Sequence, residues 1–348
     1  MGGDLDSVMI TSPCALHLQA LLPALEKKLI VLLEKPVETT VDKCAEMWKA
    51  YRNADFPPLA VGFVLRYTSF YGQVKKALDT GEIGDIRTIE AAEMLGIPLS
   101  TAYTRGWRRH SALSGPFILE KCSHDMDLMN WFAKARVRHV SSFGNRTYFL
   151  PRPEAATHCR DCPLQNDCRF SVERFRPKNP DQRFIDYVKT NPDYDLCVFN
   201  SDKDILDNQV ISLEYENDIL VTFTATMCQP RTARTIKVNG TDGQVVGDIG
   251  RDSLRVVHDA VTDTYSLGTY DTEQTRPIIH DGSGHHGGDT VISNQYKAML
   301  RGEETPPLAG LREGIDASLL ALAAQESVEQ QRTIDMAPIY QKVYGPDL

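Results

Sequence analysis

The sequence predicts an α/β domain over residues 1–66, followed by an α+β domain over residues 67–348 whose main element is a large, mostly antiparallel, open-faced sheet. Two observations support this division. In the first part, short unbroken apolar runs are separated by helical patterns, which is typical of a parallel sheet covered on both faces. From residue 209 onward, apolar and polar residues alternate, as in strands that bury only one face.

The first domain should contain three strands joined by two helices. The apolar runs at 6–10, 29–33 and 59–65 predict the strands. Leucines at helical spacing predict a helix between the first two runs, and Thr40 is a suitable N-cap for a second helix. This order of elements is typical of one part of a doubly wound parallel sheet.

The second domain should begin with a helix near 70–80 that ends at Gly81. Alternation over 209–227 predicts a β-hairpin, and the Gly-Thr-Asp-Gly turn at 240–243 predicts another strand pair. The final helix, over 308–331, is expected to pack back onto the body. We therefore expect an antiparallel sheet with helices on one side.

Composition excludes several classes of partner. The 348 residues, with 42% hydrophobic and 24% charged, suit a globular protein of two domains. A net charge of -9 gives no electrostatic attraction to nucleic acid or to an acidic membrane surface. The longest early apolar stretch is interrupted by Pro23 and Glu26, so it is neither a membrane span nor a signal peptide. We expect a cytoplasmic protein that binds a small molecule.

A segment near the middle of the chain, ILEKCSHDMDLMNWF at 118–132, combines a buried helical pattern with many titratable groups. On a helix, Glu120, His124, Asp127 and Trp131 share one face. One interpretation is a half-exposed helix in which Asp127 pairs with His124. The other is an acid/base stripe that lines a pocket.

Polar residues follow all three predicted strands of the first domain. The first run leads into Thr11, Ser12 and Pro13, with His17 close behind; the second leads into Glu34, Lys35 and Pro36; the third leads into Arg66 and Tyr67. Ligands bind beyond the carboxyl ends of parallel strands, because loops and helix N-termini gather there. The sequence therefore predicts a ligand site at this edge.

These segments resemble the family of glucose-fructose oxidoreductase, inositol dehydrogenase and MocA-like NAD(P)-dependent sugar oxidoreductases. The resemblance covers almost the whole chain, including GHHGGD at 284–289, and its most specific mark is the Glu-Lys-Pro tripeptide at 34–36. It implies a Rossmann-like first domain, NAD or NADP as cofactor, a sugar, cyclitol or related polyol as substrate, and a homo-oligomer.

The resemblance also implies roles for individual residues. The cofactor-binding residues would be Thr11, Ser12, Pro13, His17, Glu34, Lys35, Pro36 and Arg66. The last active-site motif of the family reads Asp, three residues, His, two residues, Asp, and here Glu120, His124 and Asp127 occupy those places. Glu120 departs from the family's Asp by one methylene.

Oxidation of a secondary alcohol explains the titratable stripe. It needs a base for the hydroxyl proton, and an imidazole works near neutral pH whereas a free lysine has a pKa of about 10.4. The catalytic candidates are therefore His124 as base, Lys35 bonded to the same oxygen, and Glu120 orienting or recharging the pair. Lys35 would share the proton if burial and nearby cations lower its pKa. Asp127 is expected to hold a ring nitrogen of His124 or to cap neighbouring structure, and it is also a candidate for substrate binding.

The segment RGWRRH supplies further candidates on the substrate side. Trp107, Arg108 and Arg109 fit that role, and a solvated basic turn is the alternative. Within GHHGGD, His286 and Asp289 are candidates near the substrate pocket.

The glycine-rich dinucleotide fingerprint is expected before Thr11 and is not found there. About 60 residues, two βα units of about 30 each, would precede this point, so we expect an incomplete Rossmann-like domain. Either the functional chain is longer or this chain binds cofactor poorly. A GxGxxG match at 282–287 has no βαβ context and is rejected as a cofactor loop.

The stretch 151–192, rich in Pro, Arg and Asp, predicts a long insertion that carries a cysteine cluster. C-x2-C-x5-C spacing suits structural zinc if a fourth ligand joins, and reduced thiols or an iron–sulfur cluster are the alternatives. The candidate ligands are Cys159, Cys162, Cys168 and Cys197, with Cys122 and His158 as rivals for the fourth place.

The leading functional hypothesis is hydride transfer between a nicotinamide cofactor and a hydroxyl of a sugar, cyclitol or related polyol. A relative of it is an NAD-using enzyme that cleaves a glycosidic bond through transient oxidation. The hypothesis from a different class is a non-catalytic or cofactor-impaired binding protein.

Overall fold

The computed structural model describes residues 5–259, 271–303 and 306–346. Its first sheet has three parallel strands in the order β1 (Ser7–Ile10), β2 (Ile30–Leu33) and β3 (Leu59–Val61). Helices α1 (His17–Glu26) and α2 (Val41–Asn53) connect them, as the apolar runs predict.

The third predicted strand is shorter than expected. β3 ends at Val61, and residues 64–67 form a 3-10 turn, η2 (Val64–Tyr67). Its partner β2 ends at Leu33, and the N–H of Gly62 makes the last bond, 2.8 Å to the oxygen of Leu33. The pairing of β2 with β3 therefore ends at Leu33 and Val61, ahead of η2.

A second sheet of nine described strands forms the platform of the molecule, in the order β11-β10-β9-β8-β4-β7-β6-β5-β12. All neighbouring pairs are antiparallel except β4 and β7. The predicted hairpin is β6–β7, and the strand pair across 240–243 is β8–β9. The strands are β4 (Ile86–Gly96), β5 (Val137–Asn145), β6 (Asn208–Tyr215), β7 (Leu220–Gln229), β8 (Ala233–Gly240), β9 (Gly243–Asp248), β10 (Ser253–Asp259), β11 (Asp271–Thr275) and β12 (Ile334–Asp335).

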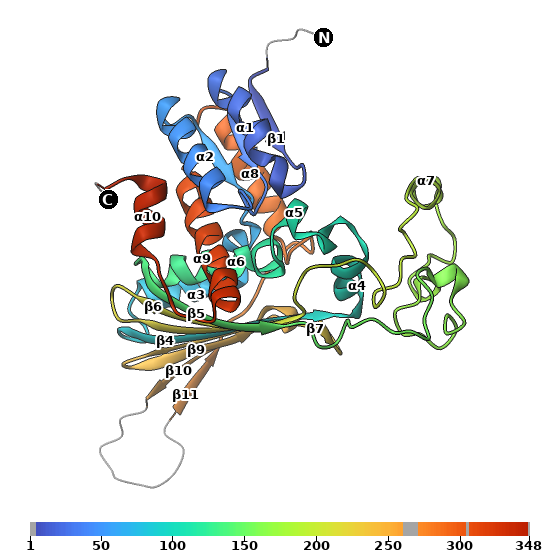
Figure 1. Ribbon diagram of the computed structural model, residues 1–348. Helices are drawn as coiled ribbons and strands as arrows, with labels where there is room; N and C mark the ends of the chain where they lie inside the picture. Colours follow the sequence, from blue (N-terminus) through green and yellow to red (C-terminus); the bar gives the residue numbers. More distant parts are fainter. Residues whose placement is uncertain (1–4, 260–270, 304–305, 347–348) are drawn as a thin grey trace.

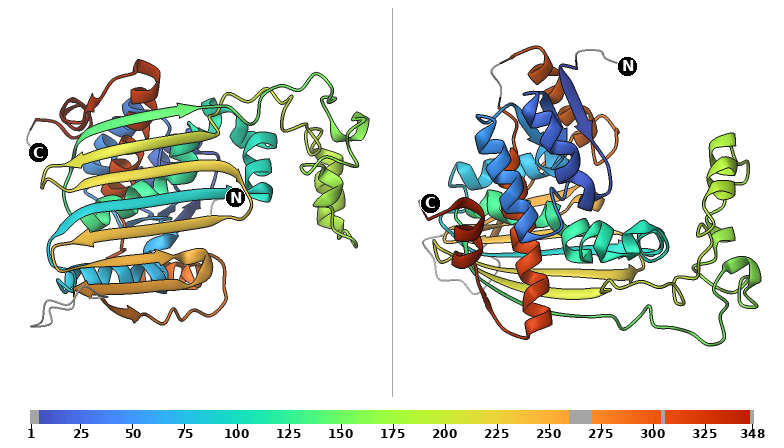
Figure 2. Two further views of the ribbon diagram at one scale, coloured as in Figure 1. Left: turned by 90° about the horizontal axis from the view of Figure 1, so that it is seen from below. Right: turned by 45° about the horizontal axis from the view of Figure 1, so that its top comes forward.

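Helices cover one face of this sheet and leave the other open (Figures 1 and 2). The helices of this part are α3 (Ser69–Asp79), α4 (Ile97–Arg105), α5 (Ser111–Ser114), α6 (Phe117–Ala133), α7 (Gln182–Thr190), α8 (Gly288–Leu300), α9 (Leu311–Gln330) and α10 (Ala337–Tyr344). The predicted α9 is present but is not the final helix, because β12 and α10 follow it. Gly81 lies just beyond α3 in the left-handed conformation, φ +69, as its predicted role requires.

The predicted insertion over 151–192 projects to one side of the platform (Figure 1). It consists of short turns and α7, so the prediction of a long loop is confirmed.

A buried ionic network fixes α6 on the sheet. Arg234 of β8 places its Nε 2.7 Å from the carboxylate of Glu93 and 2.9 Å from that of Asp125. Lys121 Nζ lies 3.1 Å from Glu93. Two of the titratable groups of α6 therefore face the sheet and balance one another there, because an unpaired buried charge would be costly.

The chain after residue 280 returns to the first sheet. α8 lies beside η2 and β2, while α9 and α10 pack on α2 (Figure 1). The N–H of Val61 donates to the oxygen of Ala309 at 3.0 Å. The proposed domain boundary at residue 66 therefore separates two sheets, and helices from the later part of the chain cover the first.

Among the helices of the described residues, none is long and apolar enough to span a bilayer.

Gly314 of α9 sets how closely this helix approaches the first sheet. A Cβ added there would lie 2.5 Å from Val37 Cγ1 and 3.0 Å from Val61 Cγ2. At Gly72, on the exposed side of α3, an added Cβ would meet nothing within 4 Å.

We therefore predict opposite effects for the same substitution at these two helical positions. Gly314→Ala should lower the free energy of unfolding by about 1 to 3 kcal/mol through overpacking. Gly72→Ala should raise it by up to about 1 kcal/mol through helix propensity. Equilibrium urea denaturation measures both, and equal stabilisation by the two variants would contradict the close approach of α9.

Candidate active site

The residues that follow β1 and β2 lie together at the carboxyl edge of the first sheet. Thr11 and Glu34 are exposed, whereas Ser12, Pro13 and Lys35 are half-buried. These side chains therefore form an accessible polar rim, as predicted from the strand ends.

The side chain of His17 contacts the backbone of both loops of this rim. Its ring is fully buried, with Nδ1 2.9 Å from the oxygen of Pro36 and Nε2 2.9 Å from the oxygen of Ser12. The ring therefore bridges the two loops and has no surface for a ligand. We correct the role expected for His17 from cofactor contact to positioning of the loops.

Lys35 connects the rim to α6. Its Nζ donates to the backbone oxygen of Glu120 at 2.7 Å, in the first turn of the helix. Glu34 packs over Gly62, where an added Cβ would lie 3.1 Å from its carboxylate. Glu120 and His124 are one turn apart on α6, and the charge of Lys35 acts on both.

Glu120 is held as a carboxylate. Arg108 Nε donates to its Oε1 at 2.6 Å, and the hydroxyl of Tyr103 donates to its Oε2. Burial alone would raise the pKa of Glu120, but the charges of Lys35 and Arg108 outweigh it and leave this pKa below its usual value. Glu120 is therefore an anion set between two cations.

His124 is kept neutral at neutral pH. Burial, and then the charge of Lys35, hold the pKa of its ring well below the usual value. The ring of Phe63 packs edge-on against it at 5.8 Å between centroids. Among the described residues, the buried Nδ1 of His124 has no hydrogen-bond partner. A neutral imidazole is the form that accepts a proton.

Asp127 pairs with Arg66 and not with His124, so of its two expected roles the structure favours support of neighbouring structure. Both carboxylate oxygens accept hydrogen bonds from Arg66, each at 2.7 Å, and both side chains are buried. Burial raises the pKa of Asp127 to about 6 against the opposing charge of Arg66. The guanidinium also lies 5.1 Å from the ring of Trp131.

The Arg66–Asp127 pair therefore has a structural role. It joins η2 to α6, and Arg66 donates in addition to the oxygen of Leu308. The two side chains are already paired with each other. The structure therefore supports neither the cofactor contact expected of Arg66 nor the substrate contact expected of Asp127.

The segment around Trp107 borders the site. Arg108 is half-buried, and its guanidinium lies 4.6 Å from the ring of Trp107. Both residues line a cavity of about 660 Å³ that extends to Tyr187 of α7. Arg109 instead bonds Asp193 and Asp202, at 2.9 and 2.7 Å, in the segment that follows the insertion.

Tyr103 is a site residue that sequence reasoning missed. It lies on α4, 17 residues before Glu120, and no motif marks it.

The four clustered cysteines line one cavity of about 310 Å³, but they do not form the predicted metal site. Among the described residues, the one group of at least three potential ligand atoms within 4.8 Å of one another is Asp252, His280 and His286. Buried Arg105 lines the same cavity as Cys159, Cys162, Cys168 and Cys197, and its NH2 lies 3.7 Å from Cys159 Sγ.

The one group of the described residues that brings three potential ligand atoms together contains none of the four cysteines. The rival ligands are also engaged elsewhere. His158 pairs with Asp195 at 3.0 Å, and Cys122 is fully buried on α6. The zinc prediction is therefore not supported.

The segment 284–289 reaches the site from the other side. His285 Nδ1 lies 2.7 Å from Asp289, and the charge of His285 is one of those that lower the pKa of His124. His286 turns away toward Asp252, at 3.3 Å. Of the two candidates in this segment, Asp289 therefore pairs with His285, and His286 lies beside Asp252.

Two family models match most of the chain. Residues 2–63 match the model of an oxidoreductase family's NAD-binding Rossmann fold, GFO_IDH_MocA, and residues 75–336 match that family's C-terminal alpha/beta domain.

Relatives by sequence include two bacterial oxidoreductases. The oxidoreductase YteT of Bacillus subtilis (strain 168) is 22% identical over 97% of this chain and 82% of its own length. An inositol 2-dehydrogenase/D-chiro-inositol 3-dehydrogenase of Halalkalibacterium halodurans is 30% identical over 45% of this chain and 41% of its own length.

Two solved structures show the same fold. Levoglucosan dehydrogenase in complex with NADH and levoglucosan has a TM-score of 0.68 at 19% identity, covering 94% of this chain and 80% of that one. An oxidoreductase domain protein from Kribbella flavida has a TM-score of 0.69 at 18% identity, covering 96% and 81%.

The geometry predicts that Lys35 tunes His124. Lys35→Met should raise the pKa of His124 because one of the charges that depress it is removed, whereas Lys35→Arg should leave it low. NMR titration of the His124 ring signals measures this shift, with His124→Gln used for assignment.

Lys43→Met is the matched control, since Lys43 pairs with Glu38 at 3.5 Å and is not among the leading causes of the low pKa of His124. An unchanged pKa of His124 in Lys35→Met would show that the two groups do not share a site.

Proposed function

Because the chain belongs to the GFO_IDH_MocA oxidoreductase family, we propose that it transfers a hydride between NAD(P) and a hydroxyl-bearing carbon of a sugar, cyclitol or related polyol. The observation that carries the proposal is the placement of a lysine ammonium and a neutral, buried imidazole at the same turns of α6. Alcohol oxidation requires both a proton acceptor and a cation beside the reacting oxygen.

The polar rim fits the nicotinamide end of a dinucleotide. It lies at the carboxyl ends of parallel strands, where such cofactors bind. Exposed Thr11 and Glu34 offer hydroxyl and carboxylate groups for ribose hydroxyls, and Lys35 lies next to them. When bound, the nicotinamide ring would supply the hydride acceptor.

The residues of this chain perform the proton chemistry in our proposal. His124 takes the hydroxyl proton as the carbon–hydrogen bond loses its hydride, and a carbonyl group results. Lys35 keeps one N–H on the oxygen of Glu120 and directs the others to the reacting oxygen, where positive charge stabilises the developing alkoxide. In the reverse direction the same contact polarises the carbonyl.

Glu120 positions this pair. Its carboxylate balances the charge of Lys35, and Arg108 and Tyr103 fix its orientation. The additional methylene relative to the family's Asp is accommodated by these two partners.

We propose the cavity beside Trp107 and Arg108 as the place for the rest of the substrate. Its volume of about 660 Å³ lies within the range of small-molecule sites. An indole face and a guanidinium suit the apolar ring face and the hydroxyl groups of a sugar.

Self-association of the open sheet face is also part of the proposal. Phe143 and Val210 face each other across β5 and β6, and their exposed fractions are 76% and 47%. A homo-oligomer would cover this apolar pair.

Light scattering after size exclusion tests the oligomer. Phe143→Asp should give a smaller species than the parent chain, whereas Leu5→Asp, an exposed apolar residue beside β1, should not. If Phe143→Asp has the same molar mass in solution as the parent chain, the face that carries Phe143 is not the oligomer interface.

The catalytic role of His124 makes the sharpest prediction. His124→Ala and His124→Gln should lower polyol-dependent formation of NAD(P)H by about 100-fold or more, because the general base is lost. Their affinity for the nucleotide, followed by protein fluorescence, should stay close to that of the parent chain, since the rim remains. A panel of hexoses and inositols, each tested with NAD⁺ and with NADP⁺, should first identify a substrate and a cofactor for this assay.

The control for this experiment is His139→Ala. His139 is a half-exposed histidine of β5 that pairs with Glu214 at 2.8 Å, away from α6. If the His124 variants turn over substrate as fast as the parent chain, His124 is not the general base. Absence of nucleotide binding to the parent chain would favour a non-catalytic protein.

A further inference from the structure

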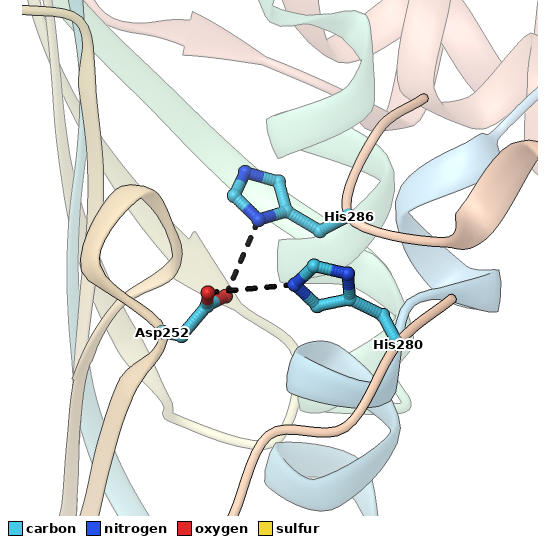
Figure 3. A group of neighbouring side chains, drawn as sticks. All are labelled: Asp252, His280 and His286. Carbon is cyan, nitrogen blue, oxygen red and sulfur yellow. Dashed lines mark hydrogen bonds and ion pairs between the residues drawn. The ribbon is translucent and has the colours of Figure 1, made fainter. Parts of the chain in front are cut away.

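Asp252, His280 and His286 converge from two separate segments of the chain (Figure 3). Asp252 follows the short turn η6 (Ile249–Arg251) between β9 and β10, where it adopts a left-handed φ of +48. The two histidines lie between β11 and α8. None of the three is among the residues that the proposed hydride transfer uses.

The distances within this group are long for hydrogen bonds. His280 Nε2 lies 3.4 Å from Asp252 Oδ2, and His286 Nδ1 lies 3.3 Å from Asp252 Oδ1. Charge-assisted hydrogen bonds are about 2.7 to 2.9 Å long. By contrast, two ligands about 2.0 to 2.1 Å from a tetrahedral zinc ion are separated by about 3.3 Å.

We propose that Asp252, His280 and His286 form a binding site for a divalent first-row transition metal ion such as Zn²⁺ or Co²⁺. Two imidazole nitrogens and one carboxylate are a donor set that such ions accept. Their ligand atoms already lie within 4.8 Å of one another, so a small closure of the side chains completes three contacts. Exposed fractions of 25% to 43% leave room for water in the remaining positions.

Protonation of the histidines follows from the contacts. The N–H of Gly282 donates to His280 Nδ1 at 3.2 Å, which leaves the ring proton on Nε2. Metal binding at Nε2 moves that proton to Nδ1 and replaces the Gly282 contact. The number of protons on His280 is unchanged.

A metal at this position would join the turn after β9 to the segment that leads into α8. Gly288, the first residue of α8, is pressed against η2, since an added Cβ would lie 2.8 Å from the oxygen of Val64. His285 directly precedes His286 in this segment, and its charge acts on the pKa of His124. The ion would therefore fix this segment beside the active site without taking part in hydride transfer.

Titration of the full-length, chelator-treated chain with Co²⁺ tests the proposal. We expect one Co²⁺ per chain with weak d–d absorption and no intense thiolate-to-cobalt band, because the ligands are nitrogen and oxygen. His280→Ala, His286→Ala and Asp252→Asn should each weaken Co²⁺ binding by at least tenfold. Competition should show that Zn²⁺ binds to the same site.

Two controls separate this site from others in the chain. His139→Ala, which disrupts an exposed histidine–carboxylate pair elsewhere, should leave Co²⁺ affinity unchanged. Thermal denaturation of the metal-free variants should match the parent chain, and only the parent and His139→Ala should be stabilised by Zn²⁺.

Three outcomes would overturn the proposal. The first is no Co²⁺ binding at millimolar concentration. The second is equal affinity in the parent chain and the three ligand variants. The third is an intense thiolate charge-transfer band, which would place the ion on the cysteines. None of these readouts depends on oxidoreductase activity.

Discussion

The hydrogen bond from Lys35 to the first turn of α6 is the contact on which the site depends. It joins the carboxyl edge of the parallel sheet to a helix that lies on the antiparallel sheet, so both layers contribute to one reaction centre. The charge of Lys35 acts on the buried carboxylate of Glu120 and, with that of Arg108, keeps its pKa below the usual value. Arg108 and Tyr103 then hold the carboxylate in place. The same positive charge, together with burial, keeps His124 neutral.

The helix α6 has two charged faces with different purposes. On the site face, Glu120 and His124 lie one turn apart beside Lys35. On the sheet face, Lys121 and Asp125 enter a buried network with Glu93 and Arg234, which fixes the helix to the platform. A third contact, between Asp127 and Arg66, links the helix to the turn after β3. Rigid support of this kind is what a site needs when two groups from different layers must meet at one oxygen.

Much of this arrangement could be predicted from the sequence, because it is encoded locally. Apolar runs located the strands, a helical pattern located α6, and the tripeptide at 34–36 marked the rim. Contacts between distant segments could not be predicted, since periodicity carries no information about which side chain a charge will meet. Arg66 therefore looked like a ligand group until Asp127 was found against it. Likewise, cysteine spacing suggested zinc because spacing along the chain does not reveal whether the thiols meet in space. Asp252, His280 and His286 come together only through the turn between β9 and β10.

The central claim is that an ammonium and an imidazole from different layers act on one substrate oxygen. A crystal structure of the chain with NAD(P)H and a polyol that it oxidises tests this most directly. The account predicts one hydroxyl oxygen within about 2.6 to 3.2 Å of both Lys35 Nζ and a ring nitrogen of His124. A bound polyol whose reacting hydroxyl contacts one of these groups while the other lies beyond hydrogen-bond reach would contradict it.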